Sequence, residues 1–173
     1  MKKLKLLSMA TISAIAVSSA VQAADLSTKG QIKVRNAIAV AENQVLNFGT
    51  IEKPVGSAVD VAVTTGGVVD GGDTTATHID TADVKEGKYT ISGSFTDTID
   101  ITAADNANVA GMSFTEITGL YDSNSADLLA GGLSAQAAPG AGTELKVGGI
   151  LNVATTVTEG DYEPGFTITV NYN

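Results

Sequence analysis

FTITVNYN, residues 166–173, ends the chain and follows a Pro164-Gly165 turn. Apolar or aromatic residues occupy every second position from Phe166 to Tyr172, and threonine or asparagine lies between them. This period of two gives an extended strand one apolar and one polar face, and β-branched and aromatic residues favour that conformation. The segment therefore predicts a half-buried β-strand at the edge of a sheet, with an aromatic residue in the penultimate place.

Alternation of the same kind recurs through most of the chain. The predicted strands lie at residues 26–40, 45–51, 59–63, 89–95, 99–101, 112–114 and 145–153. Eight or nine short strands with glycine-rich turns, and no convincing helical period, predict an all-β fold, either a sandwich or a barrel. Residues 122–142 depart from this rhythm because alanine, glycine and serine dominate there. We expect that segment to be a long surface loop with at most one helical turn.

The first residues have the pattern of a secretory signal peptide. Three lysines precede an apolar run at residues 6–17, and Val21 and Ala23 fit the small-residue cleavage pattern. We therefore expect residues 1–23 to be removed, leaving a single β-sandwich domain at residues 24–173. The run is too short for a retained transmembrane helix, which needs about 20 apolar residues. The predicted route is export through the periplasm to the cell surface, a fimbrium or the exterior, with no membrane span in the mature chain.

Charge and composition narrow the function classes. The full chain carries 10 basic and 19 acidic residues, and removal of residues 1–23 takes away three lysines, so the net charge changes from −9 to 7 − 19 = −12. An acidic surface of this strength disfavours binding to nucleic acid and to anionic lipid. The chain has no cysteine, which excludes disulfides, thiolate nucleophiles and cysteine-based zinc sites.

Candidate catalytic groups are scarce. His78 is the single histidine, so neither a multi-histidine metal site nor a Ser-His-Asp triad can be assembled from recognisable parts. We expect a non-enzymatic protein with no catalytic residue, no metal site and no cofactor. Two weaker alternatives stay open. A carboxylate pair like that of a glycosidase is one, and a Ca²⁺ site is the other, built from acids in or beside predicted loops: Asp70, Asp73, Asp97, Asp100 and Asp105.

Several motifs resemble those of known families. Gly160 is the fourteenth residue from the C-terminus and Tyr172 is the penultimate one, which resembles the C-terminal signature of chaperone-usher pilus subunits. LNFGTI at residues 46–51, ISG at 91–93, VGGILNV at 147–153 and GDY at 160–162 resemble the motifs of a secreted bacterial family, domain of unknown function 4402. These resemblances imply an immunoglobulin-like or pilin-like β-sandwich in a fimbria-like surface setting, without enzyme activity.

The pilin resemblance implies donor-strand complementation, in which the N-terminal segment of one subunit completes the sheet of its neighbour. Partners would then be further copies in a filament, a periplasmic chaperone and an outer-membrane usher. The candidate donor strand is Leu26, Thr28, Gly30, Ile32 and Val34. The candidate chaperone-facing or edge-pairing residues are Gly160, Phe166, Ile168, Val170 and Tyr172.

Two alternatives to this assembly remain at the level of the sequence. Residues 32–40 are also suited to be the first strand of the domain itself, which would leave only residues 24–29 as a spare tail. The second alternative is a self-complete secreted β-sandwich that binds a glycan, a small ligand or calcium and never polymerises.

Overall fold

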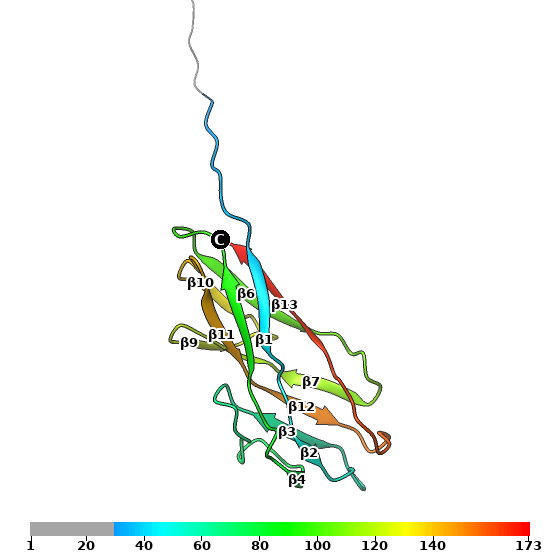
Figure 1. The fold of residues 1–173 in the computed structure, drawn as a ribbon. Coiled ribbons are helices and arrows are strands. Elements are labelled where there is room, and N and C mark those ends of the chain that lie inside the picture. The colour runs from blue at the N-terminus through cyan, green and yellow to red at the C-terminus, as the bar shows by residue number, and fades with distance from the viewer. Residues whose placement is uncertain (1–29) are drawn as a thin grey trace, which may run out of the picture. The chain divides into compact units, whose positions relative to one another are not determined.

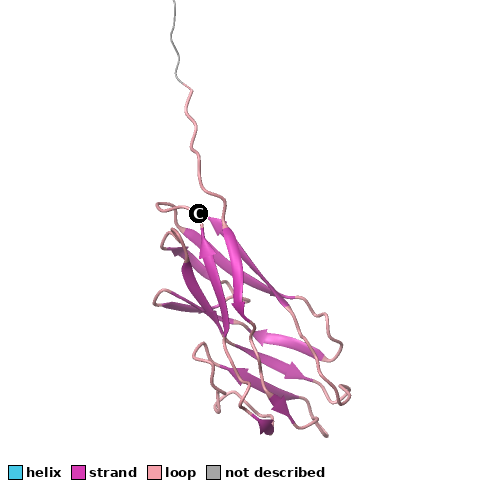
Figure 2. Ribbon diagram, in the orientation of Figure 1, coloured by secondary structure: helices cyan, strands magenta, loops and turns pink. Residues whose placement is uncertain are grey.

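The computed structural model of the protein describes residues 30–173. The predicted signal peptide, and Leu26 and Thr28 of the candidate donor strand, lie outside the described residues. Residues 34–173 form a compact unit of their own, and the fold below is that of this unit. Its secondary structure consists of strands joined by loops and turns (Figure 2), so the all-β prediction is confirmed. Within residues 30–173, no helix offers the length and apolarity that a membrane crossing requires.

The strands form four antiparallel sheets (Figure 1). The largest has the order β1-β5-β11-β8-β9, built from Ala39–Gln44, Gly87–Ser92, Thr143–Val147, Thr118–Tyr121 and Asn124–Asp127. A second has the order β10-β6-β13, from Leu133–Gln136, Ile99–Asp105 and Phe166–Tyr172. A third has the order β3-β12-β7, from Val59–Val63, Gly149–Val153 and Met112–Glu116. The fourth pairs β2, Thr50–Ile51, with β4, His78–Asp80.

The first two sheets contribute to one hydrophobic core. Ile99 and Ile101 of β6 and Ile91 of β5 are completely buried in it. Tyr89 of the first sheet meets Phe166 of the second edge-on, with their ring centroids 6.4 Å apart. Apolar residues at alternate positions on both sheets therefore face each other, which is the packing of a β-sandwich.

The structure has thirteen strands in residues 30–173, more than the eight or nine predicted, in part because two stretches of the chain each divide between sheets. Residues 112–121 form β7 and β8 on either side of Ile117, and residues 143–153 form β11 and β12 on either side of Gly148. A Cβ atom at Gly148 would lie 2.3 Å from the carbonyl oxygen of Val63. Only glycine allows this close approach, so Gly148 is where the strand can pass from one sheet to the next.

The predicted loop at residues 122–142 is wrong. The segment contains β9 and β10, and Leu128 and Leu133 are buried in the core. A Cβ atom at Gly119 would lie 2.8 Å from both Cδ atoms of Leu128, so the leucine fills the space that a missing side chain leaves in β8. The predicted strand at residues 89–95 is also too long, because β5 ends at Ser92 and Phe95 lies exposed in the following turn.

Candidate functional site

Two sheet edges lie side by side along one flank of the sandwich (Figure 1). β13 pairs with β6 over its whole length, from Phe166 opposite Asp105 to Tyr172 opposite Ile99. β1 pairs only with β5, and no other strand of residues 30–173 pairs with the free side of either β1 or β13. Both strands therefore present unpaired backbone groups of the kind that can receive another strand.

A depression lies between these edges, and we call it the slot. It has a volume of about 220 Å³ and is lined by Val40 and Glu42 of β1, Tyr89 of β5, and Phe166 and Ile168 of β13. The same residues show that β1 and β13 run in opposite directions, because Glu42 lies near the start of β13 while Asn36, just before β1, contacts its end at Tyr172.

The apolar face of β13, of which Phe166 and Ile168 line the slot, is incompletely covered. Phe166, Ile168, Val170 and Tyr172 pack against the core but remain only half-buried. On the neighbouring strand β6, Ile99 and Ile101 are completely buried. Val40, on the β1 side, leaves 41% of its surface exposed. The core thus lacks cover along one line, and an additional extended segment would supply it.

The slot also holds two polar groups. Burial raises the pKa of the Tyr89 hydroxyl to about 12, and the negative charge of Glu42 adds to the shift. Glu42 itself is exposed on the slot side of an edge strand. A charged residue in such a position opposes indiscriminate pairing with other sheet edges, so the slot places a carboxylate beside the apolar side chains of Val40, Phe166 and Ile168.

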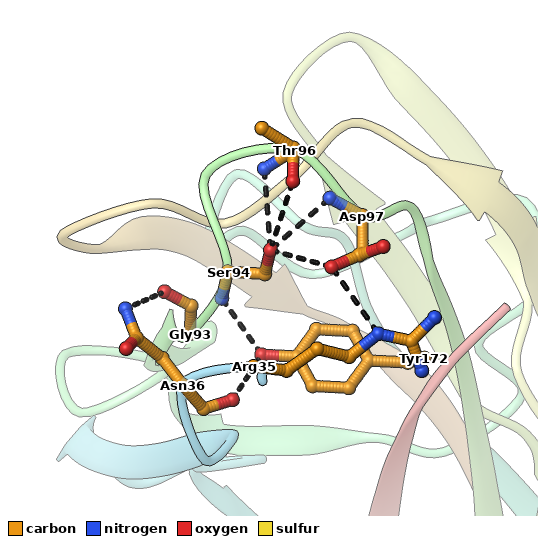
Figure 3. A network of polar contacts seen from close by, with 7 residues as sticks. All are labelled: Arg35, Asn36, Gly93, Ser94, Thr96, Asp97 and Tyr172. Carbon is orange, nitrogen blue, oxygen red and sulfur yellow. Dashed lines mark hydrogen bonds and ion pairs between the residues drawn. The ribbon is translucent and has the colours of Figure 1, made fainter. Parts of the chain in front are cut away.

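A network of polar contacts closes the end of the slot where β13 finishes (Figure 3). The Tyr172 hydroxyl donates to the carbonyl oxygen of Asn36 at 2.6 Å and accepts from the backbone N–H of Ser94 at 2.7 Å. The Asn36 side-chain amide donates to the carbonyl oxygen of Gly93 at 3.2 Å. The last strand is thereby tied to the segment that leads into β1 and to the turn between β5 and β6.

An ion pair reinforces this network. Arg35 Nε lies 3.3 Å from Asp97 Oδ2, and the Asp97 side chain is only 9% exposed. The Ser94 hydroxyl donates to the same carboxylate oxygen at 2.8 Å, and the Arg35 guanidinium lies 5.4 Å from the centre of the Tyr172 ring. We call Arg35, Asn36, Ser94, Asp97 and Tyr172 the clasp. Because Asp97 is largely desolvated, loss of the Arg35 ion pair would be destabilising.

Glycine is required beside the clasp. A Cβ atom at Gly93 would lie 2.6 Å from the Tyr172 hydroxyl oxygen and 3.4 Å from Pro139. The tyrosine hydroxyl can reach both of its backbone partners only because this space is open.

The predicted site residues separate into two groups. Of the candidate donor strand, Gly30, Ile32 and Val34 are exposed and belong to no strand, with 88% of Ile32 and 83% of Val34 accessible. The first strand of the domain is β1, which begins at Ala39, so residues 32–38 are not part of it. Of the C-terminal group, Gly160 lies in the loop before β13, and the other four line one face of that strand: Phe166, Ile168, Val170 and Tyr172.

Most of the acidic residues considered as calcium ligands make other contacts in the structure. Asp97 belongs to the clasp. Asp105 accepts from the backbone N–H groups of Ala107 and Phe114, and Asp100 accepts from that of Ala135. Asp70 accepts from the N–H of Gly72, and with Asp73 it borders a separate depression of about 150 Å³. Within residues 30–173, no group of three or more His, Asp or Glu side chains is arranged to hold a metal ion.

The clasp residues other than Tyr172 were not found by sequence reasoning. Their contacts join positions 57 to 136 residues apart, and Arg35 and Asn36 carry no local pattern that distinguishes them from other polar residues before a strand.

Comparison with known proteins gives a family and little else. No curated protein and no solved structure matches the chain. The model of one protein family, Domain of unknown function (DUF4402), matches residues 38–172, which includes every strand from β1 to β13. The chain therefore belongs to the DUF4402 family.

Proposed function

We propose that this protein is an exported, non-enzymatic structural subunit of a bacterial surface filament, assembled by donor-strand exchange. The observation that carries the proposal is the open slot between β1 and β13, bordered by apolar side chains that are only half-buried. A self-complete domain of this size normally covers such a row of core-facing residues. A subunit that receives a strand from another chain leaves it open.

The strand order supports the same proposal. An immunoglobulin-like sandwich has sheets with the strand orders A-B-E-D and C-F-G. In this chain β1-β5-β11-β8 fits the first order and β6-β13 fits C-F, and within residues 30–173 no strand pairs with the free side of β13, where G would lie. We therefore propose that the slot takes the seventh strand and that a neighbouring subunit supplies it.

The candidate donor is the segment of residues 26–34. Its described part exposes Ile32 and Val34 almost fully. Burying Leu26, Ile32 and Val34 would contribute roughly 5 to 9 kcal/mol, at about 1.5 to 3 kcal/mol for each side chain. Whole domains are stable by only about 5 to 15 kcal/mol, so strand exchange would be a major part of the stability of an assembled subunit.

A subunit with an open slot would also need a partner protein that protects it during export. An unpaired edge beside exposed apolar side chains is prone to unselective association. A periplasmic chaperone that covers β13, and an outer-membrane usher that releases it, would protect the subunit until a donor segment arrives. In this proposal Phe166, Ile168 and Val170 contact the chaperone first and the donor segment afterwards.

Deletion of residues 24–33 tests the function. The deletion stops before Arg35 because Arg35 holds Asp97 in the clasp. With a chaperone supplied, we expect the truncated protein to be a folded monomer that does not elongate, while the full mature chain forms thin filaments in electron micrographs. Cells lacking the gene should lose such a filament. The proposal is wrong if the truncated protein unfolds while the full mature chain purifies as a stable monomer.

A further inference from the structure

The clasp lies at the point where the candidate donor segment joins the domain. Arg35 and Asn36 are fixed to Asp97 and Tyr172, whereas Val34, the residue before them, is 83% exposed. The contacts of the clasp thus begin at Arg35, directly after the exposed Val34 and beside the C-terminal end of β13 (Figure 3).

Strand direction limits how a chain could fill its own slot. β1 and β13 run in opposite directions along the slot (Figure 1). A segment that folded back just before β1 would run antiparallel to β1 and therefore parallel to β13. Parallel pairing is slightly less stable for each residue than antiparallel pairing. The segment of a second copy has no such restriction and can run antiparallel to β13.

Folding back also requires a reversal of the chain between residues 34 and 39. Three of the four intervening residues are held in place. Arg35 pairs with Asp97, the carbonyl oxygen of Asn36 accepts from Tyr172, and the side chain of Ile38 packs against the core. A tight turn through this stretch would break the clasp and remove the Arg35 ion pair from the buried Asp97 carboxylate.

We propose that the clasp is a positioning device that keeps the N-terminal segment of each chain out of its own slot and commits it to the slot of a second copy. Tyr172 and Arg35 are its principal residues. The inference rests on the proposed function and adds a role to it: the penultimate tyrosine selects exchange between subunits over closure within one subunit.

The test uses the full mature chain with Tyr172→Phe, which keeps the ring on the core and removes both hydrogen bonds of the hydroxyl. Tyr162→Phe is the matched control, because the Tyr162 hydroxyl bonds only to Thr158, in a loop away from the slot. Arg35→Met is a second variant, which keeps an apolar stem and removes the ion pair. Hydrogen exchange at residues 26–34 of the monomer fraction, and the fraction of polymer against protein concentration, are the two readouts.

In the wild-type monomer and in Tyr162→Phe we expect unprotected exchange at residues 26–34 and a polymer fraction that rises with concentration. In Tyr172→Phe and Arg35→Met we expect those amides to slow by about tenfold or more, as in a locally folded segment, and the polymer fraction to fall several-fold. The proposal is overturned if both variants match Tyr162→Phe in both readouts, or if the wild-type monomer is already protected there.

The two readouts distinguish failure of the proposed filament function from failure of the proposed role of the clasp. If the wild type and both clasp variants polymerise equally, strand exchange stands and the clasp has no role in directing it. If the wild type never polymerises but residues 26–34 become protected only in the two variants, the clasp controls the segment and the filament function is wrong. Near-ultraviolet circular dichroism of each variant establishes that its core is intact.

Discussion

We expect substitutions at two adjacent residues of β13 to differ strongly in their effect on the binding of a donor peptide at the slot. Ile168 lines the slot and Thr169 lies on the opposite, exposed face of the same strand. The perturbation is Ile168→Asp, with Thr169→Asp as the control of equal charge and similar strand propensity. Each is introduced into the protein that lacks residues 24–33, and a synthetic peptide of residues 24–34 is then added.

The expected magnitude follows from the chemistry of a carboxyl group under an inserted strand. Insertion would remove water from the carboxylate that Ile168→Asp introduces, and protonating an aspartate with an ordinary pKa of about 3.9 at pH 7 costs about 4 kcal/mol. That cost weakens peptide binding about 1,000-fold. In Thr169→Asp the carboxylate keeps its water, so binding should change by less than about tenfold.

Thermal denaturation measures the difference. At a peptide concentration 100 times the dissociation constant, binding stabilises the folded domain by about 2.7 kcal/mol, which for a domain of this size raises the midpoint by roughly 10 °C. The Thr169→Asp protein should show nearly that rise, and the Ile168→Asp protein should show none at the same peptide concentration. A peptide with Ile32→Asp serves as the negative control. Equal shifts in the two variants would refute the assignment of the slot.

Two further predictions concern the fold and its pH dependence. Gly148→Ala should destabilise the domain by about 3 kcal/mol or more in urea unfolding, because the added carbon would meet the Val63 carbonyl oxygen at 2.3 Å. The control, Gly30→Ala, has open space around it and should change stability by less than about 0.5 kcal/mol. Equal effects of the two substitutions would contradict the role given to Gly148. The pKa of Tyr89 is about 12 in the folded state against about 10 when unfolded, so its contribution is complete below pH 10 and is lost as the pH rises toward 12. We expect the wild type to lose about 2 kcal/mol more than Tyr89→Phe between pH 9 and about pH 11.5, and parallel stability curves would exclude this linkage.

The alternation of side chains predicted the strands that have one buried face. β3, β5, β12 and β13 were found because apolar residues recur at every second position, and the structure turns those positions toward the core, where those of β13 are half-buried. The sandwich itself follows from the number of such strands, since each needs a second layer to cover its apolar face.

The short strands β9 and β10 were missed for a physical reason. Each has four residues rich in alanine, serine and other small or polar side chains, so their own composition carries little β-propensity. They form because each pairs with a neighbouring strand of its sheet. β9 pairs with β8 through a tight turn at Asp122, where φ is +57°, and β10 pairs with β6. Tertiary pairing thus decides their conformation, and sequence periodicity does not report it.

Part of the candidate site could likewise be predicted from the sequence, and part could not. The apolar face of β13 was predictable because a strand with one apolar face must cover it, whatever the partner. That this face stays half-open could not be predicted, because the missing cover is a property of the whole strand order. The partners of Tyr172, which include Asn36 at a separation of 136 residues, could not be predicted from local patterns either.

The slot and the clasp share one strand, β13, so residues 166–172 contribute to both parts of the site. One face of β13 borders the slot with Phe166 and Ile168, and the same face ends in Tyr172, whose hydroxyl bonds to Asn36 in the segment before β1. The other edge beside the slot is β1, into which residues 35–38 lead. Because β13 borders the slot and also anchors residues 35–36, the proposed acceptance of one strand and presentation of another are joined at Tyr172.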